Sequence, residues 1–562
     1  MANLWNMDRL AAEWEARGLD RRELFRLVAG GGALTVIVTL MGTKPLHAAA
    51  APAAQDGDSQ ISILWRQPVT LNPLYSTAGF EQQVERLMFG ALVKMSGDLV
   101  PTPDLAESID ISDDASVYTF NLHQNITFND GEPLTAEDVV FTLETALNPA
   151  AAAIWRGRLL GIAGAEEFGD GTADSVSGIA TPDEYTVEIT LAAPDSAFLP
   201  VICNFSGLGI LPHHILGDVA PDQLQAHPFS LEPTVSAGAY EFVQLEADQY
   251  LELAANPDYF GDAPAIARIF MRIVTPNVGI SQLETGEMDL LSLPVSEADR
   301  VRGLPDVTVI SVPSPSMDFL ALNMNREPLQ NLGLRQAMMH AIDRQGIVTS
   351  VLQGEGEVVN SPIFGPEWMG VPEGLNEYAY DPELAQQILA DSGWDTSQTL
   401  QIMHLPDQGV KDAVISIVQE QWRTIGIQTE ILQVDGAELN RRYITDNDFD
   451  IFYNAGGVFR ADPSISGSYF LTRNFAPAGG NASHYSNERV DELYAEGQAT
   501  GDNEARQAAY TEIAQILNEE LPWIWFWSPN SLYAVSNRLQ GFVAPSYIDN
   551  KMWNTETWSL AE

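Results

Sequence analysis

Residues 128–141 read FNDGEPLTAEDVVF, and this stretch carries the clearest local structural signals in the chain. Asp130-Gly131 is a tight-turn dipeptide, because glycine adopts the positive φ that many turns require. A few residues later, Thr135 can cap a helix through its hydroxyl while Asp138 reaches back to the Thr135 amide. Apolar residues then recur at helical spacing. The stretch therefore predicts a turn followed at once by a helix.

Strand patterns lie on both sides of this helix. Apolar and polar residues alternate with period two in residues 118–122 and 185–191, as in half-buried strands. Further strand candidates cover residues 240–245, 250–253 and 268–274, separated by turn signals. The part of the chain up to about residue 315 is therefore predicted to be rich in strands.

Helices dominate after about residue 319. Asp381 can cap a helix that has Pro382 at its first position and Gly393 as its stop. Strand-like segments at residues 449–453 and 523–527 lie between further amphipathic helices. The second half is thus α/β. Because single hydrophobic cores stop growing at roughly 250 to 300 residues, a chain of 562 residues predicts two or three lobes.

The first 54 residues have the composition of an export signal. Arg21-Arg22 stands in a twin-arginine-like context and precedes a weakly apolar stretch at residues 27–41. A membrane-spanning helix needs roughly 20 apolar residues, so this stretch is too short to be a typical one. A run of small residues follows, and we expect cleavage between residues 48 and 55. The alternative is a short anchor that stays uncleaved.

Charge and cysteine content narrow the class of protein. The formal net charge is −49, which makes nucleic acid a poor partner. Cys203 is the only cysteine, so neither a lipid-bearing cysteine after the signal nor an internal disulfide is expected. The sequence therefore predicts an exported protein without a lipid anchor, in the periplasm or its extracytoplasmic equivalent.

Several motifs together resemble the family-5 extracellular solute-binding proteins, the dipeptide and oligopeptide binders of ABC importers. Residues 128–141 look like the most characteristic stretch of that family. The other matching segments occur in family order and at family-like spacing: residues 323–325, 334–337, 341–344, 380–385 and 393–394. The motifs themselves are turns and caps, so they identify a fold, and function follows by analogy.

The resemblance implies an α/β, bilobal periplasmic-binding-protein type II fold (cluster C) with an extra small domain inserted in the first lobe. The implied boundaries are a signal peptide at 1–54, lobe I at 55–88, 197–318 and 529–562, an inserted subdomain at 89–196, and lobe II at 319–528. Hinge closure around a ligand would make the loaded state recognisable to a permease.

The resemblance also implies a ligand anchor in lobe II. Peptide binders of this family use an aspartate after a central strand to pair with the ligand's α-amino group, and Asp462 occupies the matching place. Phe459 replaces the family's tryptophan, and Pro463 follows directly. Asp462 alternatively shapes an Asp-Pro turn. Arg460 alternatively pairs with a ligand carboxylate or with Asp462.

Other candidates for ligand contact lie far from Asp462 in the sequence. The segment 72–79 resembles a family segment whose backbone pairs with an extended peptide, and the small residues Ala78 and Gly79 permit close approach. Tyr75 is either an aromatic wall of the cleft or local packing. Trp527 is the tryptophan of the 523–527 strand that we expect at the cleft.

The expected function is capture of di- or oligopeptides and their delivery to ABC permease subunits. Alternatives are a receptor for an oligosaccharide, nickel chelate, haem or opine, or a ligand receptor for a membrane sensor. The sequence contains no His-Glu-x-x-His, Gly-x-Ser-x-Gly or Ser-x-x-Lys motif, so an enzyme is not expected. No cofactor is expected, nor a metal from the adjacent His213-His214, which we place on a strand. A monomer is expected.

Overall fold

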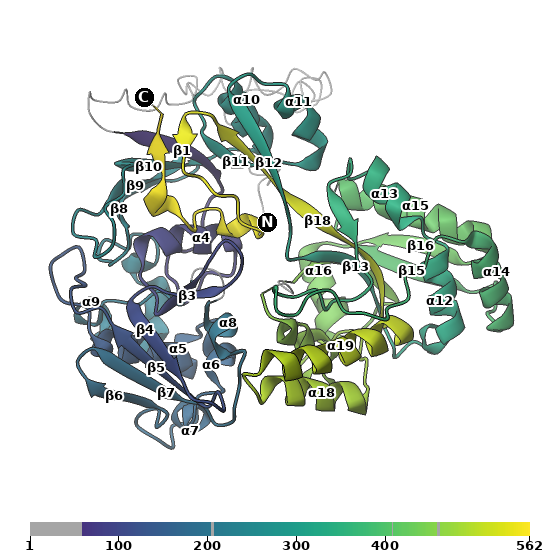
Figure 1. Cartoon of the computed structure of the whole chain (residues 1–562), viewed down its shortest axis with the longest axis horizontal. Coiled ribbons are helices and arrows are strands. Elements are labelled where there is room, and N and C mark those ends of the chain that lie inside the picture. The colour runs from purple at the N-terminus through teal and green to yellow at the C-terminus, as the bar shows by residue number, and fades with distance from the viewer. Residues whose placement is uncertain (1–58, 204–206, 407–408, 458–460, 562) are drawn as a thin grey trace, which may run out of the picture. The chain divides into compact units, whose positions relative to one another are not determined.

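The computed structural model of the chain describes residues 59–203, 207–406, 409–457 and 461–561 (Figure 1). The expected signal peptide at residues 1–54, Phe459 and Arg460 lie outside these ranges. Within the described residues, no helix is both long enough and apolar enough to cross a membrane.

One large mixed sheet runs through the described chain. Its main path is β16-β15-β17-β13-β18-β11-β1-β10-β9-β8, and β12 and β14 also pair with β18. The strands of its first part are β1 (Gln60–Trp65), β8 (Tyr240–Glu246), β9 (Tyr250–Ala255), β10 (Arg268–Ile273), β11 (Leu290–Ser292) and β12 (Val307–Pro313). The strands of its second part are β13 (Met317–Leu322), β14 (Gly356–Val358), β15 (Thr399–His404), β16 (Gln428–Gln433), β17 (Ile451–Gly456) and β18 (Trp523–Ser536).

Strand β18 connects the two parts of this sheet (Figure 1). Its first half pairs with β13 and β14, for example Ile524 with Leu320. Its second half pairs with β11 and β12, for example Tyr533 with Ile310. The long strand thus leaves one set of partners and joins the other without a break.

Two large hydrophobic cores flank this connection, and a smaller third cluster packs around Ile280 and Leu532. We call the part of the chain around the first core lobe I and the part around the second core lobe II. The first core contains Ile61 and Leu253, and the second contains Leu320 and Ile513. The lobe boundaries expected from the sequence stay a prediction.

A separate four-stranded antiparallel sheet lies in lobe I, in the order β4-β5-β7-β6. Its strands are β4 (Ala106–Ile111), β5 (Val117–Leu122), β6 (Ile179–Asp183) and β7 (Thr186–Thr190). Helix α5 (Ala136–Leu147) begins with the expected capping box, because Thr135 accepts a hydrogen bond from the Glu137 amide and Asp138 accepts one from the Thr135 amide. Gly131 has φ +94°, as the turn requires.

The remaining elements of lobe I are short. They are α4 (Gly79–Met88), β2 (Val93–Met95), β3 (Pro101–Pro103), α6 (Arg156–Leu159), α7 (Ala165–Gly169), α8 (Phe198–Cys203), α9 (His213–Leu216), α10 (Pro276–Glu284), α11 (Ala298–Arg302), β19 (Leu539–Gln540) and β20 (Ser559–Leu560). The strand expected at His213-His214 is wrong: both residues begin α9, and their imidazoles pair separately with Glu137 and Asp130.

Helices cover the sheet of lobe II. They are α12 (Leu332–His340), α13 (Arg344–Ser350), α14 (Pro382–Asp391), α15 (Val410–Ile425), α16 (Gly436–Asn440), α17 (Gly467–Phe470), α18 (Glu488–Gln498) and α19 (Asn503–Glu520). Asp381 caps α14 as expected, accepting a hydrogen bond from the Leu384 amide at 2.8 Å. Gly426 closes α15 in the left-handed conformation.

Candidate functional site

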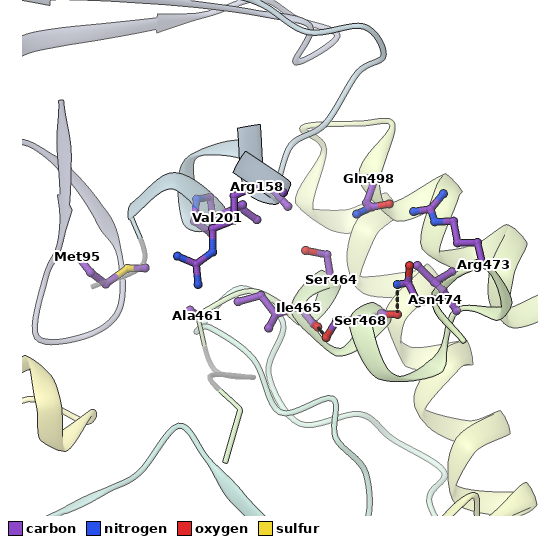
Figure 2. A pocket seen from close by; sticks show the side chains of 15 residues that line it. Met95, Arg158, Val201, Ala461, Ser464, Ile465, Ser468, Arg473, Asn474 and Gln498 are labelled. Atoms are coloured by element: carbon purple, nitrogen blue, oxygen red, sulfur yellow. Dashed lines mark hydrogen bonds between the residues drawn. The ribbon is translucent and has the colours of Figure 1, made fainter. Parts of the chain in front are cut away.

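A cavity of about 520 Å³ lies between the two lobes (Figure 2). Lobe I contributes Met95 and residues of α6 and α8, and lobe II contributes residues between Ala461 and Asn474 together with Gln498. Among the described residues, two arginines and no acidic side chain line this interlobe cavity, although the whole chain carries 77 acidic residues. The cavity thus differs in charge from the rest of the molecule.

The lobes also touch beside this cavity. The Ser196 amide of lobe I donates a hydrogen bond to the Gln498 carbonyl of lobe II at 3.0 Å. Ala461 packs into the first core although its neighbours in sequence belong to lobe II, and Ile465 packs against the same core. The segment that carries Asp462 is therefore held against both lobes.

Asp462 sits at the start of this segment with its carboxylate buried, only 3% exposed. Its Oδ1 accepts a hydrogen bond from the Ser464 amide at 2.9 Å, and this contact caps the short 3₁₀ turn Pro463–Ser466. An Asp-Pro pair is well suited to this role, because the proline needs no amide partner at the first position.

Arg506, on α19, is the main partner of Asp462. Its Nη2 lies 2.9 Å from Oδ1 and 2.7 Å from Oδ2, and Arg506 is itself only 5% exposed. Burial is the largest single influence on the pKa of Arg506 and lowers it, but the charge and hydrogen bonds of Asp462 together with Tyr510 raise that pKa overall. The guanidinium also donates to the Gly497 carbonyl and stacks over Trp368 at 4.6 Å. Asp462 is thus half of a buried ion pair.

This geometry is consistent with the turn-forming alternative for Asp462, and its role as a ligand anchor stays a prediction. The described contacts are those of the turn-forming role, and the carboxylate is already neutralised by Arg506. In this arrangement it is not free to receive a ligand ammonium. A role of Asp462 as a direct anchor would require the Arg506 contact to break.

Arg158 supplies a charge of the opposite kind. It lies on α6 over the ring of Trp155 at 4.9 Å, and its Nη1 is buried without a hydrogen-bond partner among the described residues. Burial lowers the pKa of Arg158. Figure 2 shows Arg158 and Arg473 reaching the interlobe cavity from opposite sides. Unpaired guanidinium groups of this kind suit carboxylate groups.

Comparison with known proteins identifies the class of molecule that carries this cavity. Residues 100–476, more than half of the chain, match the model described as bacterial extracellular solute-binding proteins, family 5 Middle. The chain belongs to this family.

Two proteins that are similar in sequence to this chain support its place in this family. A Brucella melitensis protein, provisionally named an ABC transporter peptide-binding protein, is 29% identical over 87% of this chain and 91% of its own length. The oligopeptide-binding protein AppA of Bacillus subtilis is 26% identical over 93% of this chain and 95% of its own length.

Solved structures of the family share the two-lobed fold. AppA of Bacillus subtilis in complex with a nonapeptide superposes with a TM-score of 0.74 at 24% identity, covering 90% of this chain and 100% of that structure. NikZ of Campylobacter jejuni in complex with Ni(L-His) also reaches 0.74, at 23% identity, covering 89% and 99%. The expected bilobal type II fold is confirmed.

The other residues expected at the ligand site of this solute-binding protein lie apart from the interlobe cavity. Tyr75 packs in the first core at 6% exposure, which supports local packing, and burial raises its pKa to about 12. Ala78 and Gly79 begin α4 and are half-buried. A Cβ on Gly79 would lie 2.4 Å from Asp549 Oδ2, so the side chain that approaches this glycine is Asp549.

Trp527 is fully buried in the second core and stacks on Phe526, with ring centroids 4.8 Å apart. Its place on β18 is opposite Asp318 of β13 and Val358 of β14. The expected cleft position therefore gives way to a core position. Its indole nitrogen has no hydrogen-bond partner among the described residues.

Sequence reasoning missed Arg158 and Arg506. A signal for Arg506 exists: it shares one face of α19 with Tyr510, Ile513 and Leu517, and a charged residue on an apolar face requires a buried partner. No comparable signal marks Arg158. Among the described residues, no group of three or more His, Cys, Asp and Glu side chains could hold a metal ion.

Proposed function

We propose that this solute-binding protein captures peptides in the cavity between its lobes and delivers them to the permease of an ABC transporter. The observation that carries the proposal is the interlobe cavity of about 520 Å³ in a chain whose named relatives bind peptides. Sites for small ligands typically measure about 300 to 1,000 Å³, so a short peptide is a suitable occupant.

The proposal also includes export of the protein to an extracytoplasmic location. Residues 1–54 act as a twin-arginine export signal that is removed between residues 48 and 55. Cys203 is the only cysteine and is buried, and burial raises its pKa, so it neither carries a lipid nor reacts. The mature protein is a periplasmic or extracytoplasmic monomer without catalytic activity.

The charges around the cavity favour peptides with an acidic group. Among the described residues, Arg158 has no acidic partner and Arg473 interacts only electrostatically with Asp195, while Asp462 is occupied by Arg506. A carboxylate on the ligand would give Arg158 the charge-assisted partner that the chain does not supply. A free α-amino group, in contrast, finds no unpaired carboxylate in the cavity lining.

The same observation favours a second candidate, an acidic solute without a free amine. The solved structures that this chain resembles include AgaA in complex with agropinic acid, so the fold accommodates an acid that is not a peptide. Both candidates place the ligand carboxylate at the arginines and differ in whether the ligand is a peptide.

The test combines native mass spectrometry of the purified mature protein, which identifies ligands released on mild unfolding, with calorimetric titration of defined peptides. Ala-Glu-Ala is compared with Ala-Ala-Ala, both amidated at the C terminus so that only the first carries a carboxylate, and each with a free and with an acetylated amino group. We expect the glutamyl peptide to bind at least tenfold more tightly, and acetylation to change affinity less than threefold. R158Q and R473Q should lose the preference, and R300Q, at an exposed ion pair on α11, should keep it.

Each contrary result has a definite meaning. Loss of binding on acetylation together with full binding by R158Q would replace this model by direct anchoring on Asp462. Release of an amine-free acidic solute, with no peptide bound, would establish the second candidate. Release of a neutral sugar would overturn both.

A further inference from the structure

A second cavity, of about 370 Å³, lies within lobe I. It opens where β1 and β11 end, at Trp65 and Ser292, and these strands run parallel. The carboxyl ends of parallel strands are a common place for ligands in α/β proteins. The cavity also reaches Asp549, the side chain that packs against Gly79, so it adjoins the segment expected to line the ligand cleft.

Lys551 lines this lobe I cavity and is only 4% exposed. Its ammonium has three hydrogens to donate, yet its one hydrogen bond among the described residues is a long contact of 3.4 Å to Ser292 Oγ. Burial lowers the pKa of Lys551 to about 8, while Asp549 acts to raise it and Arg66 to lower it. The ammonium is thus buried and makes fewer hydrogen bonds than it can donate.

Gln83 is the second unsatisfied group in the lining. It is 2% exposed, and neither its amide nitrogen nor its amide oxygen has a hydrogen-bond partner among the described residues. Buried side-chain amides are almost always hydrogen-bonded, so an amide of this kind calls for a partner in the cavity. Lys551 and Gln83 together offer donors to a single acceptor group.

The rest of the lining is mainly apolar. Trp65, Phe80, Pro276 and Leu293 are among its members. A ligand group that fits must therefore combine an apolar body with an acceptor-rich, negatively charged end. An aliphatic or aromatic carboxylate has this chemistry.

We propose that the lobe I cavity is a subsite for a carboxylate carried on an apolar group of the ligand, with Lys551 and the Gln83 amide as its donors. This inference rests on the proposed function, since it names a chemical group of the captured solute. It adds a site in lobe I that is separate from the arginines of the interlobe cavity.

The proposal makes binding depend on pH. A bound carboxylate favours the charged form of Lys551, so binding should draw a proton onto the lysine when the free amine is present. The charged groups that act on Lys551 are Asp549, which raises its pKa, and Arg66, which lowers it. Carboxylate affinity should therefore fall as the pH rises above about 8.

The test uses two small probes, N-acetyl-L-phenylalanine and its uncharged amide, titrated calorimetrically into the mature protein at pH 7 and pH 9. We expect the carboxylate to bind at least tenfold more tightly than the amide at pH 7, and the difference to shrink at pH 9. K551M should remove the preference, Q83L should reduce it severalfold, and R423Q, at an exposed ion pair on α15, should leave it unchanged.

Equal affinity for the two probes, absence of carboxylate binding, or a preference that survives in K551M would overturn the proposal. If K551M fails to fold, Q83L and the pH dependence of the wild type still decide. Peptide capture is measured in parallel by native mass spectrometry. Retained peptides without a carboxylate preference refute this subsite alone, whereas a carboxylate preference in a protein that captures no peptide refutes the proposed function alone.

Discussion

Two buried sites, one in each lobe, treat ionisable groups in opposite ways. In lobe II, Asp462 and Arg506 neutralise each other through two contacts below 3 Å. Lobe I also contains a largely buried ion pair, Lys94 with Asp104 at 3.0 Å. Its Glu85 and Lys551 differ: among the described residues, each has only a neutral serine hydroxyl as side-chain hydrogen-bond partner, Ser76 for the carboxyl and Ser292 for the ammonium. The contrast indicates that an ion pair holds a segment of backbone in place. A buried group without a charged partner can still form a favourable contact with a ligand.

The largest effect is expected when the lobe II pair is broken. D462A leaves the Arg506 guanidinium buried without its partner, which typically costs about 3 to 5 kcal/mol. Urea unfolding followed by circular dichroism measures the loss. E504Q, at an exposed position on the same helix, is the control and should change stability by less than about 0.5 kcal/mol.

The double variant D462L/R506M tests whether the instability of D462A comes from the unpaired Arg506 charge. It replaces both charges by apolar groups, so it should recover much of the stability that D462A loses. If the double variant is instead as unstable as D462A, the segment between Ala461 and Ile465 depends on the Ser464 cap more than on the ion pair.

The next effect concerns Glu85. Burial, the largest cause, raises its pKa from 4.5 to about 8, with Glu81 adding to the rise and the Ser76 hydrogen bond opposing it. The folded state therefore holds a proton that the unfolded state releases. The stability this confers is complete below pH 4.5 and is lost as the pH rises through 8.

E85Q should remove this pH dependence. The wild type should lose about 4 kcal/mol between pH 4.5 and 8 through this group, and E85Q should lose far less, because a neutral amide also accepts the Ser76 hydrogen bond. Chemical unfolding across this pH range is the measurement. Parallel pH profiles for the two proteins would show that Glu85 is ionised in the fold.

The contribution of Lys551 to the pH dependence of stability should have the opposite sign and a smaller magnitude. Its folded pKa of about 8 lies below the ordinary lysine value of 10.5, so the folded state binds fewer protons between these values and stability rises with pH across that window. K551M removes the buried ammonium and should stabilise the protein at pH 7 by about 1 to 3 kcal/mol. Unfolding at pH 7 and pH 10 should show the gain shrinking at the higher pH.

Most of the fold could be predicted because its signals are local. The Thr135 and Asp138 capping box and the Asp381 cap each depend on residues three positions apart, and the structure confirms both. The strand alternation at residues 118–122 is likewise confirmed by β5. Local rules of turn, cap and period fix such elements before any tertiary contact forms.

The sites could not be predicted in the same way, because their partners are distant in the chain. Arg506 is 44 residues from Asp462, and Ser292 is 259 residues from Lys551. Asp462 lies where the family resemblance predicts a ligand anchor, but its observed partner depends on the packing of α19. The contributions of Phe459 and Arg460 stay predictions, since these residues lie outside the described ranges.

The smallest effect tests whether Tyr75 belongs to the core or to a ligand site. Its hydroxyl is buried with no hydrogen-bond partner among the described residues. Removing such a group usually leaves stability unchanged or improves it by up to about 1 kcal/mol, because an unsatisfied polar atom no longer has to be buried. Y75F should therefore unfold at the same or a slightly higher urea concentration and bind peptides as the wild type does. A tenfold loss of peptide affinity at unchanged stability would instead make Tyr75 a ligand-binding hydroxyl. The unpaired groups of lobe I would then form one extended site and not a single carboxylate subsite.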